Sequence, residues 1–243
     1  MTRQEFYRKK YKKINPEWQD SLTLYKEIID KYVNQETRIL DIGCGHGDYL
    51  KDVYSKTSYT YGIDPDRSAL SKNSIIKNKF CFEAETLSFC DNFFDLVVNA
   101  WVMEHLINPY PVFKEIFRVL KPSGKLIFLT PNSLNYNIWI IRAVPQKFHH
   151  FFTHKLYDRQ EHDTFSKYYK VNSMKKIDKM LLPLGFNKIQ FICNGDPTYI
   201  SFNNLFFKIA VWIENIINNK FPDAKVHLIG IYEKSSKIIS KLS

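Results

Sequence analysis

Three glycines follow an aspartate, Asp41, in the stretch Arg-Ile-Leu-Asp-Ile-Gly-Cys-Gly-His-Gly-Asp, residues 38–48. Ile39, Leu40 and Ile42 form a short apolar run, which is typical of a buried parallel strand. A strand that turns through glycines into the start of a helix presents bare backbone N–H groups to a ligand. Asp41 adds a carboxylate at the end of the strand. Together these features predict a site for a nucleotide-like cofactor.

The spacing of the glycines narrows the choice of cofactor. The dinucleotide fingerprint G-x-G-x-x-G needs a third glycine, but Asp48 or Leu50 stands there, and the sequence has no G-x-x-x-x-G-K-[ST] P-loop. The pattern present is D-x-G-x-G-x-G, and in it the sequence resembles the class I S-adenosylmethionine-dependent methyltransferases. The resemblance implies that S-adenosylmethionine is the cofactor and that the loop wraps its methionine end. The loop residues implied in binding are Asp41, Gly43, Cys44 and Gly45.

Further candidate cofactor residues follow the second and third expected strands. Asp64 lies about twenty residues after the first glycine, where sheets of this class hold ribose hydroxyls by a carboxylate. A carboxylate suits a vicinal diol because it can accept two hydrogen bonds, although a helix cap is the alternative role for Asp64. Pro65 ends the strand and is included in the predicted site. By resemblance, Glu83 accepts a hydrogen bond from the adenine amine and the backbone of Ala84 also faces the ring.

The candidates for acid–base chemistry are two histidines. His105, in Glu-His-Leu, follows Asn99 and Trp101, which we expect at the carboxyl end of the fourth strand, where open α/β sheets bind ligands. An orienting or structural role for His105 is the alternative to catalysis. By resemblance, His162 in Glu-His-Asp-Thr-Phe-Ser lies near the methyl acceptor, unless it is an ordinary loop histidine. A base is needed only if the acceptor is a hydroxyl or a protonated amine.

The elements that position these residues predict an α/β fold. The resemblance, which runs from Thr37 to Asn132, implies a Rossmann-like doubly wound sheet, mostly parallel with an antiparallel last strand, and we expect a helical substrate-cap insertion. We expect one domain over residues 1–243, with a helical leader at 1–35 and cap insertions at 132–172 and 195–224. The expected strands are 39–42, 59–64, 80–83, 93–99, 125–130, 186–193 and 225–233. The expected helices include 16–33, 67–77, 109–120, 173–184 and 202–217.

The leader is basic and aromatic, and two interpretations stay open. By resemblance Tyr7 or Tyr11 lies near the cofactor; the alternative is a solvated, frayed segment. The apolar segments Leu134–Phe152 and Phe202–Ile217, together with basic residues, are consistent with peripheral contact with an anionic membrane. The alternative is that both segments form the core of the lid.

Composition sets the remaining limits. The formal charge of +10 permits an acidic partner, but a biased base composition explains it equally well, and no RNA-binding module is visible, so we expect no nucleic acid. The cysteines show no zinc spacing, and His149, His150 and His154 match no standard ligand set, so no metal is expected. We expect a cytoplasmic enzyme that methylates an oxygen of a small-molecule or lipid- or glycan-linked acceptor. The alternatives are RNA or protein methylation, and a catalytically silent cofactor-binding subunit.

Overall fold

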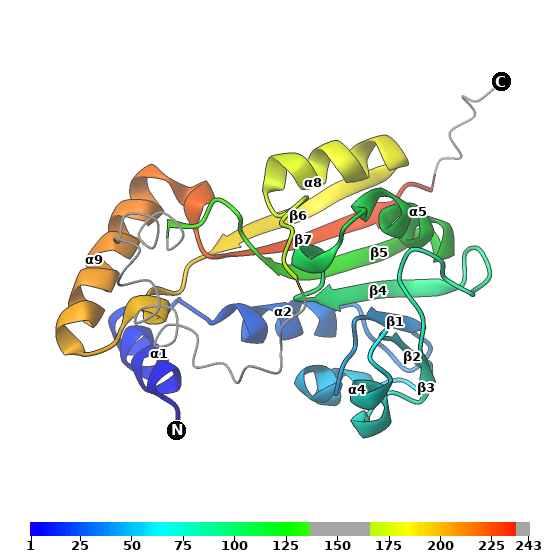
Figure 1. The fold of residues 1–243 in the computed structure, drawn as a ribbon, viewed down its shortest axis with the longest axis horizontal. Helices are drawn as coiled ribbons and strands as arrows, with labels where there is room; N and C mark the ends of the chain where they lie inside the picture. Colours follow the sequence, from blue (N-terminus) through cyan, green and yellow to red (C-terminus); the bar gives the residue numbers. More distant parts are fainter. Residues whose placement is uncertain (137–165, 237–243) are drawn as a thin grey trace.

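A single sheet organises the chain in the computed structural model, which describes residues 1–136 and 166–236 (Figure 1). Its seven strands run in the order β3-β2-β1-β4-β5-β7-β6, and β7 is antiparallel to both of its neighbours. The remaining pairs are parallel. The strands are β1 (Ile39–Ile42), β2 (Thr60–Ile63), β3 (Asn78–Phe80), β4 (Phe94–Ala100), β5 (Leu120–Pro131), β6 (Phe186–Asn194) and β7 (His227–Lys234). The predicted mostly parallel sheet with an antiparallel last strand is confirmed.

Helices cover both faces of this sheet. The helices are α1 (Arg3–Ile14), α2 (Ser21–Asp30), α3 (Lys51–Tyr54), α4 (Arg67–Lys72), α5 (Pro109–Val119), α8 (Met174–Leu181) and α9 (Asn204–Lys220). Short 3₁₀ turns are η1 (Asp48–Leu50), η2 (Met103–His105), η3 (Leu182–Leu184), η4 (Pro197–Ile200) and η5 (Pro222–Ala224). In the described parts of the chain, no helix combines the length and the apolar character needed to cross a membrane.

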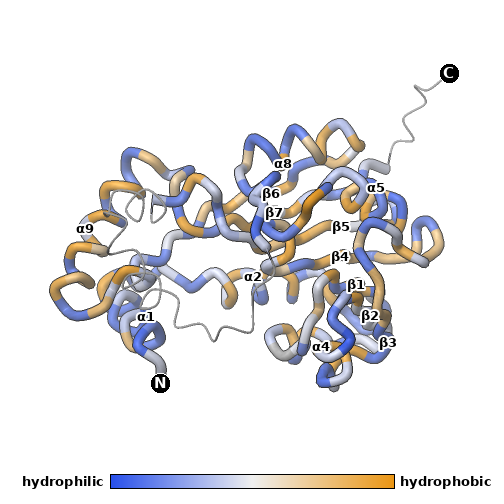
Figure 2. The backbone as a smooth tube through the Cα atoms, in the orientation of Figure 1, coloured by the Kyte–Doolittle hydropathy of each residue, from blue (hydrophilic) through white to orange (hydrophobic). Residues whose placement is uncertain are grey.

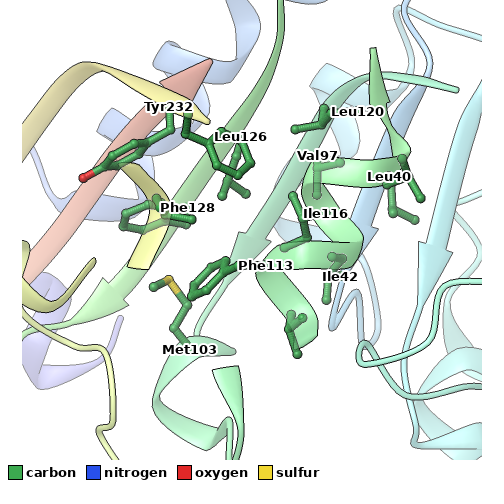
Figure 3. Packing of buried hydrophobic residues seen from close by; sticks show 14 of the residues in the cluster. Leu40, Ile42, Val97, Met103, Phe113, Ile116, Leu120, Leu126, Phe128 and Tyr232 are labelled. Carbon is green, nitrogen blue, oxygen red and sulfur yellow. The ribbon is translucent and has the colours of Figure 1, made fainter. Parts of the chain in front are cut away.

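The core has two halves, one on each face, because side chains alternate along every strand. On one face Leu40, Val97 and Phe128 pack against Phe113 and Ile116 of α5 (Figure 3). On the other face the cluster contains these side chains: Ile39, Val98, Ile127 and, from α2, Tyr25 and Ile29. The short strands are therefore apolar on both sides, as expected for a parallel sheet between two helical layers.

Three of the wrongly predicted boundaries have a local explanation. The helix expected at residue 16 begins at Ser21, because the Asp20 carboxylate accepts the N–H groups of Leu22 and Thr23 at 3.2 and 3.1 Å and caps the helix there. The third strand ends at Phe80, after pairing with only three residues of β2, so Glu83 lies beyond it. Strand β5 begins at residue 120 because Leu120 already pairs with Phe94.

The leader is an ordered helix rather than a frayed segment. Thr2 and Glu5 form a capping box at its start. Tyr7 is buried and stacks on Phe207 of α9, with ring centroids 5.1 Å apart. Tyr11 is buried against Trp18, with centroids 5.0 Å apart. The frayed alternative was therefore wrong, since the two tyrosines hold α1 in place against α9 and Trp18, whereas a position of Tyr7 or Tyr11 near the cofactor stays a prediction.

A buried ion pair completes this attachment of the leader. The Arg8 guanidinium donates to Asp196 Oδ2 from Nε at 3.0 Å and from Nη2 at 2.7 Å. Asp196 is fully buried next to η4, which packs on α9. Of the expected cap, residues 195–224 are described and contain η4, α9 and η5, whereas 137–165 of the other insertion lie outside the described residues.

Candidate cofactor-binding site

The glycine loop after β1 needs its glycines for conformation and for space. Gly43, Gly45 and Gly47 have φ values of +71°, +46° and +77°, a region that side chains disfavour. A Cβ atom on Gly43 would lie 2.3 Å from Cγ2 of Val102, at the end of β4. The loop therefore approaches the residues after β4 with no room for a side chain.

Backbone N–H groups in the loop are already paired within the protein. Gly43 and Cys44 both donate to the carbonyl oxygen of Ile63, at 2.8 and 3.1 Å, and Gly45 donates to Asp64 Oδ2 at 2.9 Å. The expectation of bare N–H groups was wrong for these three residues, because the loop reaches the end of β2 and its N–H groups find acceptors there. The loop is thus held in shape before any ligand binds.

Asp64 is the residue that ties this loop to β2. Besides Gly45, its carboxylate accepts the N–H of Asp66 at 2.8 Å, and the side chain is largely buried. The helix cap of α4 is Asp66, which accepts from Ser68 and Ala69. The capping alternative for Asp64 was therefore wrong. Each carboxylate oxygen keeps further lone pairs, so Asp64 can still accept hydrogen bonds from a diol.

Asp41 lies beneath the loop rather than on the surface of the site. It is fully buried and accepts hydrogen bonds from the hydroxyls of Tyr54 at 2.6 Å and Tyr49 at 3.2 Å. Burial raises the pKa of Asp41 to about 7, although the two hydroxyls act in the opposite direction. The Asp41 side chain therefore bonds to residues of η1 and α3 and supports the loop from within the core, and its predicted contact with the cofactor stays a prediction.

Cys44 is also directed into the core. Its Sγ atom lies 2.7 Å from where a Cβ on Gly62 would be, and burial raises the pKa of the thiol. Only the backbone of Cys44 can therefore meet a ligand, and the thiol is unreactive at neutral pH.

A cavity of about 250 Å³ opens beside the loop and collects residues from four separate segments. Among the predicted residues, Gly43, Pro65, Glu83, Ala84 and His105 line it. Sequence reasoning did not name the apolar walls of this cavity, which are formed by Ile42, Ile63, Phe82, Val102 and Leu106. The sequence could have identified these wall residues by two signals: they are apolar, and they stand close to Gly43, Pro65, Glu83 and His105 in the chain. Apolar walls with two carboxylates, Glu83 and Glu85, suit a flat heterocycle that carries an amino group.

Asn99 and Trp101 do not line this cavity. Asn99 is opposite Ile42 in the register of β4 with β1, and its Oδ1 atom is buried without a hydrogen-bond partner among the described residues. Trp101 adopts φ +60°, a genuine outlier for a bulky residue. Its ring is 37% exposed and lies edge-on to His227 at 4.9 Å. Both residues stand at the carboxyl end of β4, next to the loop, and their predicted contact with the cofactor stays a prediction.

His105 is held in one orientation by two segments. The carbonyl oxygen of Ser166 lies 3.0 Å from Nδ1 and can only accept, so the proton of the neutral ring is on Nδ1. Nε2 is then the basic nitrogen, and it lies 3.9 Å from Oε1 of Glu104. Glu104 is buried, which raises its pKa, and its Oε2 accepts from the hydroxyl of Thr130 at 3.2 Å. His105 thus combines a basic nitrogen with a place on the cavity wall.

The other predicted histidines cannot be located. His162, His149, His150 and His154 lie outside the described residues, although Ser166, four positions after His162, touches His105. In the parts of the chain that are described, no three His, Cys, Asp or Glu side chains gather in a group able to hold a metal ion. A larger cavity of about 460 Å³ lies between residues 32–37 and the turn at 121–125, away from the glycine loop.

Comparison with known proteins supports this reading of the loop. Residues 40–128 match the family described as a methyltransferase domain. The chain is 30% identical over 135 residues to a ubiquinone biosynthesis O-methyltransferase of Maricaulis maris, covering 49% of this chain and 52% of that protein. It is 29% identical to a ubiquinone/menaquinone biosynthesis C-methyltransferase of Laribacter hongkongensis, covering 63% and 68%. The chain spans about half the length of the first curated relatives that it matches.

Solved structures share the fold at low sequence identity. An S-adenosylmethionine-dependent methyltransferase from Mesorhizobium loti superposes with a TM-score of 0.60 at 14% identity, covering 86% of this chain and 95% of that one. The [4+2]-cyclase SpnF superposes with a TM-score of 0.59 at 15% identity, covering 90% and 87%. The second example shows that the fold alone does not fix the reaction. The sheet order and the glycine loop, together with the match of residues 40–128 to the methyltransferase-domain family, show that this chain resembles the class I S-adenosylmethionine-dependent methyltransferases.

Proposed function

We propose that this protein transfers a methyl group from S-adenosylmethionine to a hydroxyl of a small-molecule or lipid- or glycan-linked acceptor. The observation that carries the proposal is the convergence of Gly43, Pro65, Glu83 and Ala84 on one cavity, with Asp64 bonded to the adjoining loop. These residues come from separate parts of the chain and occur in the order that the family pattern implies.

The residues of the cavity divide the cofactor between them in this proposal. Glu83 is exposed at the cavity and would accept a hydrogen bond from the adenine amine, while Ile63 and Leu106 would pack against the ring. Asp64 would accept the ribose hydroxyls. The glycine loop is already ordered by its own hydrogen bonds. It would therefore hold the methionine end without losing further conformational entropy on binding.

When bound, S-adenosylmethionine supplies an electrophilic methyl group on a positively charged sulfur. The protein must chiefly align the acceptor oxygen, the methyl carbon and the sulfur. As the oxygen–carbon bond forms and the carbon–sulfur bond breaks, the hydroxyl proton needs an acceptor. We assign this role to Nε2 of His105, with the buried carboxyl group of Glu104 nearby to stabilise the imidazolium that forms.

The proposed class of acceptor follows from the relatives of this chain. The relatives named above include an O- and a C-methyltransferase of quinone biosynthesis. A lipid-linked acceptor would place the protein at a membrane surface, so we include peripheral contact with an anionic membrane in the proposal.

Labelled methyl transfer tests the proposal directly. The purified protein is incubated with methyl-labelled S-adenosylmethionine and a cell extract, which is then separated into lipid, small-molecule, RNA and protein fractions. We expect label in the lipid or small-molecule fraction, and much less with His105→Gln if a hydroxyl is the acceptor. Label confined to RNA or protein would contradict the acceptor class. Cofactor binding without any transfer would point to a silent subunit or another reaction.

A further inference from the structure

Helix α9 is apolar on two opposite faces. Its inner face consists of Phe207, Ala210, Glu214 and Ile217 and is buried against η4 and η5, with Phe207 stacked on Tyr7 of α1. On the other side Leu205, Ile209 and Trp212 are 65%, 42% and 64% exposed. Positions i, i+4 and i+7 share one helical face, so these three form a continuous stripe. A helix on the surface of a globular protein normally has a polar outer face, whereas α9 exposes three large apolar side chains there beside Lys208, Asn215 and Asn219.

Helix α1 lies beside α9 and supplies positive charge. Six of its twelve residues are Lys or Arg, and its single acidic residue, Glu5, is used in the capping box. Lys9, Lys12 and Lys13 are exposed, as is Lys208 on α9. The two helices are joined by the stacked Tyr7 and Phe207 rings and by a 2.8 Å hydrogen bond from Lys10 to Asn204.

No exposed acidic side chain on α9 offsets this charge. The one acidic residue of the helix, Glu214, is buried and accepts a hydrogen bond from the Tyr136 hydroxyl at 2.6 Å. We define the basic–apolar surface by its apolar and its basic side chains. The apolar ones are Leu205, Ile209 and Trp212 of α9, and the basic ones are Lys9, Lys12 and Lys13 of α1 and Lys208 of α9.

The surface stands at the functional edge of the sheet. In Figure 1, α1 and α9 lie beyond the carboxyl ends of β4 and β5, the edge at which the glycine loop and Trp101 are also found. Figure 2 shows hydrophobic stretches along α9 beside the mainly hydrophilic α1. A partner seated on this surface would therefore be close to the edge where an acceptor must enter.

An apolar stripe could bind either a second copy of this chain or a membrane, and the charge around it distinguishes the two. In a two-fold dimer the same surface meets itself, so the lysines of α1 would face those of the second copy and oppose association. An anionic bilayer instead attracts the lysines and accepts the apolar side chains, Trp included, at its interface. We infer that the basic–apolar surface is the site at which this protein docks on an anionic membrane.

This inference deepens the proposed function and rests on it for the reason to visit a membrane, namely a lipid-linked acceptor. Its test does not depend on that acceptor. Vesicle flotation measures docking, whereas calorimetry with S-adenosylhomocysteine measures the cofactor site. The two can therefore fail separately. Every variant below is first checked for folding by circular dichroism and for unchanged cofactor affinity.

The first experiment tests the apolar stripe. The protein is floated with vesicles of phosphatidylglycerol and phosphatidylcholine, and separately with phosphatidylcholine alone, at low salt. We expect flotation only with the anionic vesicles. For the double variant Leu205→Ser/Trp212→Ser, we expect the partition coefficient to fall by a factor of about ten or more. The matched control, Leu182→Ser/Ile189→Ser, also removes exposed apolar side chains but from η3 and β6, and we expect it to float normally.

The second experiment tests the charges. Lys9→Gln/Lys13→Gln should lower the partition coefficient about fivefold for each lysine, and the difference should shrink as salt is raised. The control Lys175→Gln/Lys176→Gln removes two exposed lysines from α8 and should have no such effect.

Three results would overturn the inference. The wild-type protein could remain at the bottom of the gradient with both kinds of vesicle at low salt. The control variants could lose flotation as much as the surface variants. Sedimentation could show a dimer that Leu205→Ser/Trp212→Ser dissociates, without vesicle binding, in which case the partner is a second copy of the chain.

Discussion

The buried carboxyl group of Asp41 should make stability depend on pH. Its pKa is raised from 3.8 to about 7 in the folded protein, chiefly because burial disfavours the charged form. Between these two values the folded chain keeps a proton that the unfolded chain has released. The free energy of unfolding should therefore fall as the pH rises from about 4 to about 7 and change no further from this source above that.

The size of the effect follows from the two pKa values. The difference between 3.8 and about 7 corresponds to about 4 kcal/mol, which is an upper bound because the surroundings can relax. Asp41→Asn has nearly the same shape and cannot ionise, and Tyr49 and Tyr54 can still bond to its amide. We expect this variant to lack the pH-dependent loss and to be more stable than wild type above pH 7, by at most about 4 kcal/mol.

Urea unfolding at pH 5 and pH 8.5, followed by circular dichroism, measures this difference. Asp52→Asn is the control, because Asp52 is an exposed carboxylate on α3, the helix that also carries Tyr54. We expect Asp52→Asn to follow the wild type at both pH values. If Asp41→Asn is less stable than wild type at pH 8.5, Asp41 is a carboxylate stabilised by the tyrosine hydroxyls, and the argument from burial is wrong.

Three further predictions concern the loop, the leader and the strained residue. Asp64→Ala should weaken S-adenosylhomocysteine binding by about 1–3 kcal/mol in calorimetry. The variant should also be less stable, since two backbone N–H groups lose their acceptor. Unchanged affinity would mean that Asp64 only closes the loop and does not bind the cofactor. Arg8→Met should cost about 3–5 kcal/mol in urea unfolding, because buried Asp196 loses its cation, and Asp196→Asn in the same chain should restore part of it. Trp101→Gly should be more stable than Trp101→Ala by about 1 kcal/mol, because φ +60° disfavours a side chain; the reverse order would remove the case for strain.

The features of the fold that could be predicted from sequence are those determined by residues close together in the chain. The apolar runs predicted the strands, and the D-x-G-x-G-x-G pattern predicted the loop after the first strand, whereas the hydrogen bonds that link the loop to β2 were not predicted. The signal for the start of α2 was also local, because Asp20 is a residue type that commonly caps helices. The start was predicted wrongly because Pro16 was taken as the first turn instead.

What could not be predicted depends on contacts between distant residues. The burial of Asp41 was not predicted, because nothing in the motif shows that the hydroxyls of Tyr49 and Tyr54 would donate to its carboxylate. The attachment of α1 to the cap joins Arg8 to Asp196, which are 188 positions apart. A sequence pattern carries no signal for a pairing of that range.

The central claim is that the cavity beside the glycine loop binds S-adenosylmethionine. Isothermal titration calorimetry with S-adenosylmethionine and S-adenosylhomocysteine, and with NAD as the control ligand, tests it most directly. The account predicts binding of both sulfur compounds, on the order of micromolar Kd as for many metabolite enzymes, and no binding of NAD. Heat with NAD and none with either sulfur compound would contradict the assignment.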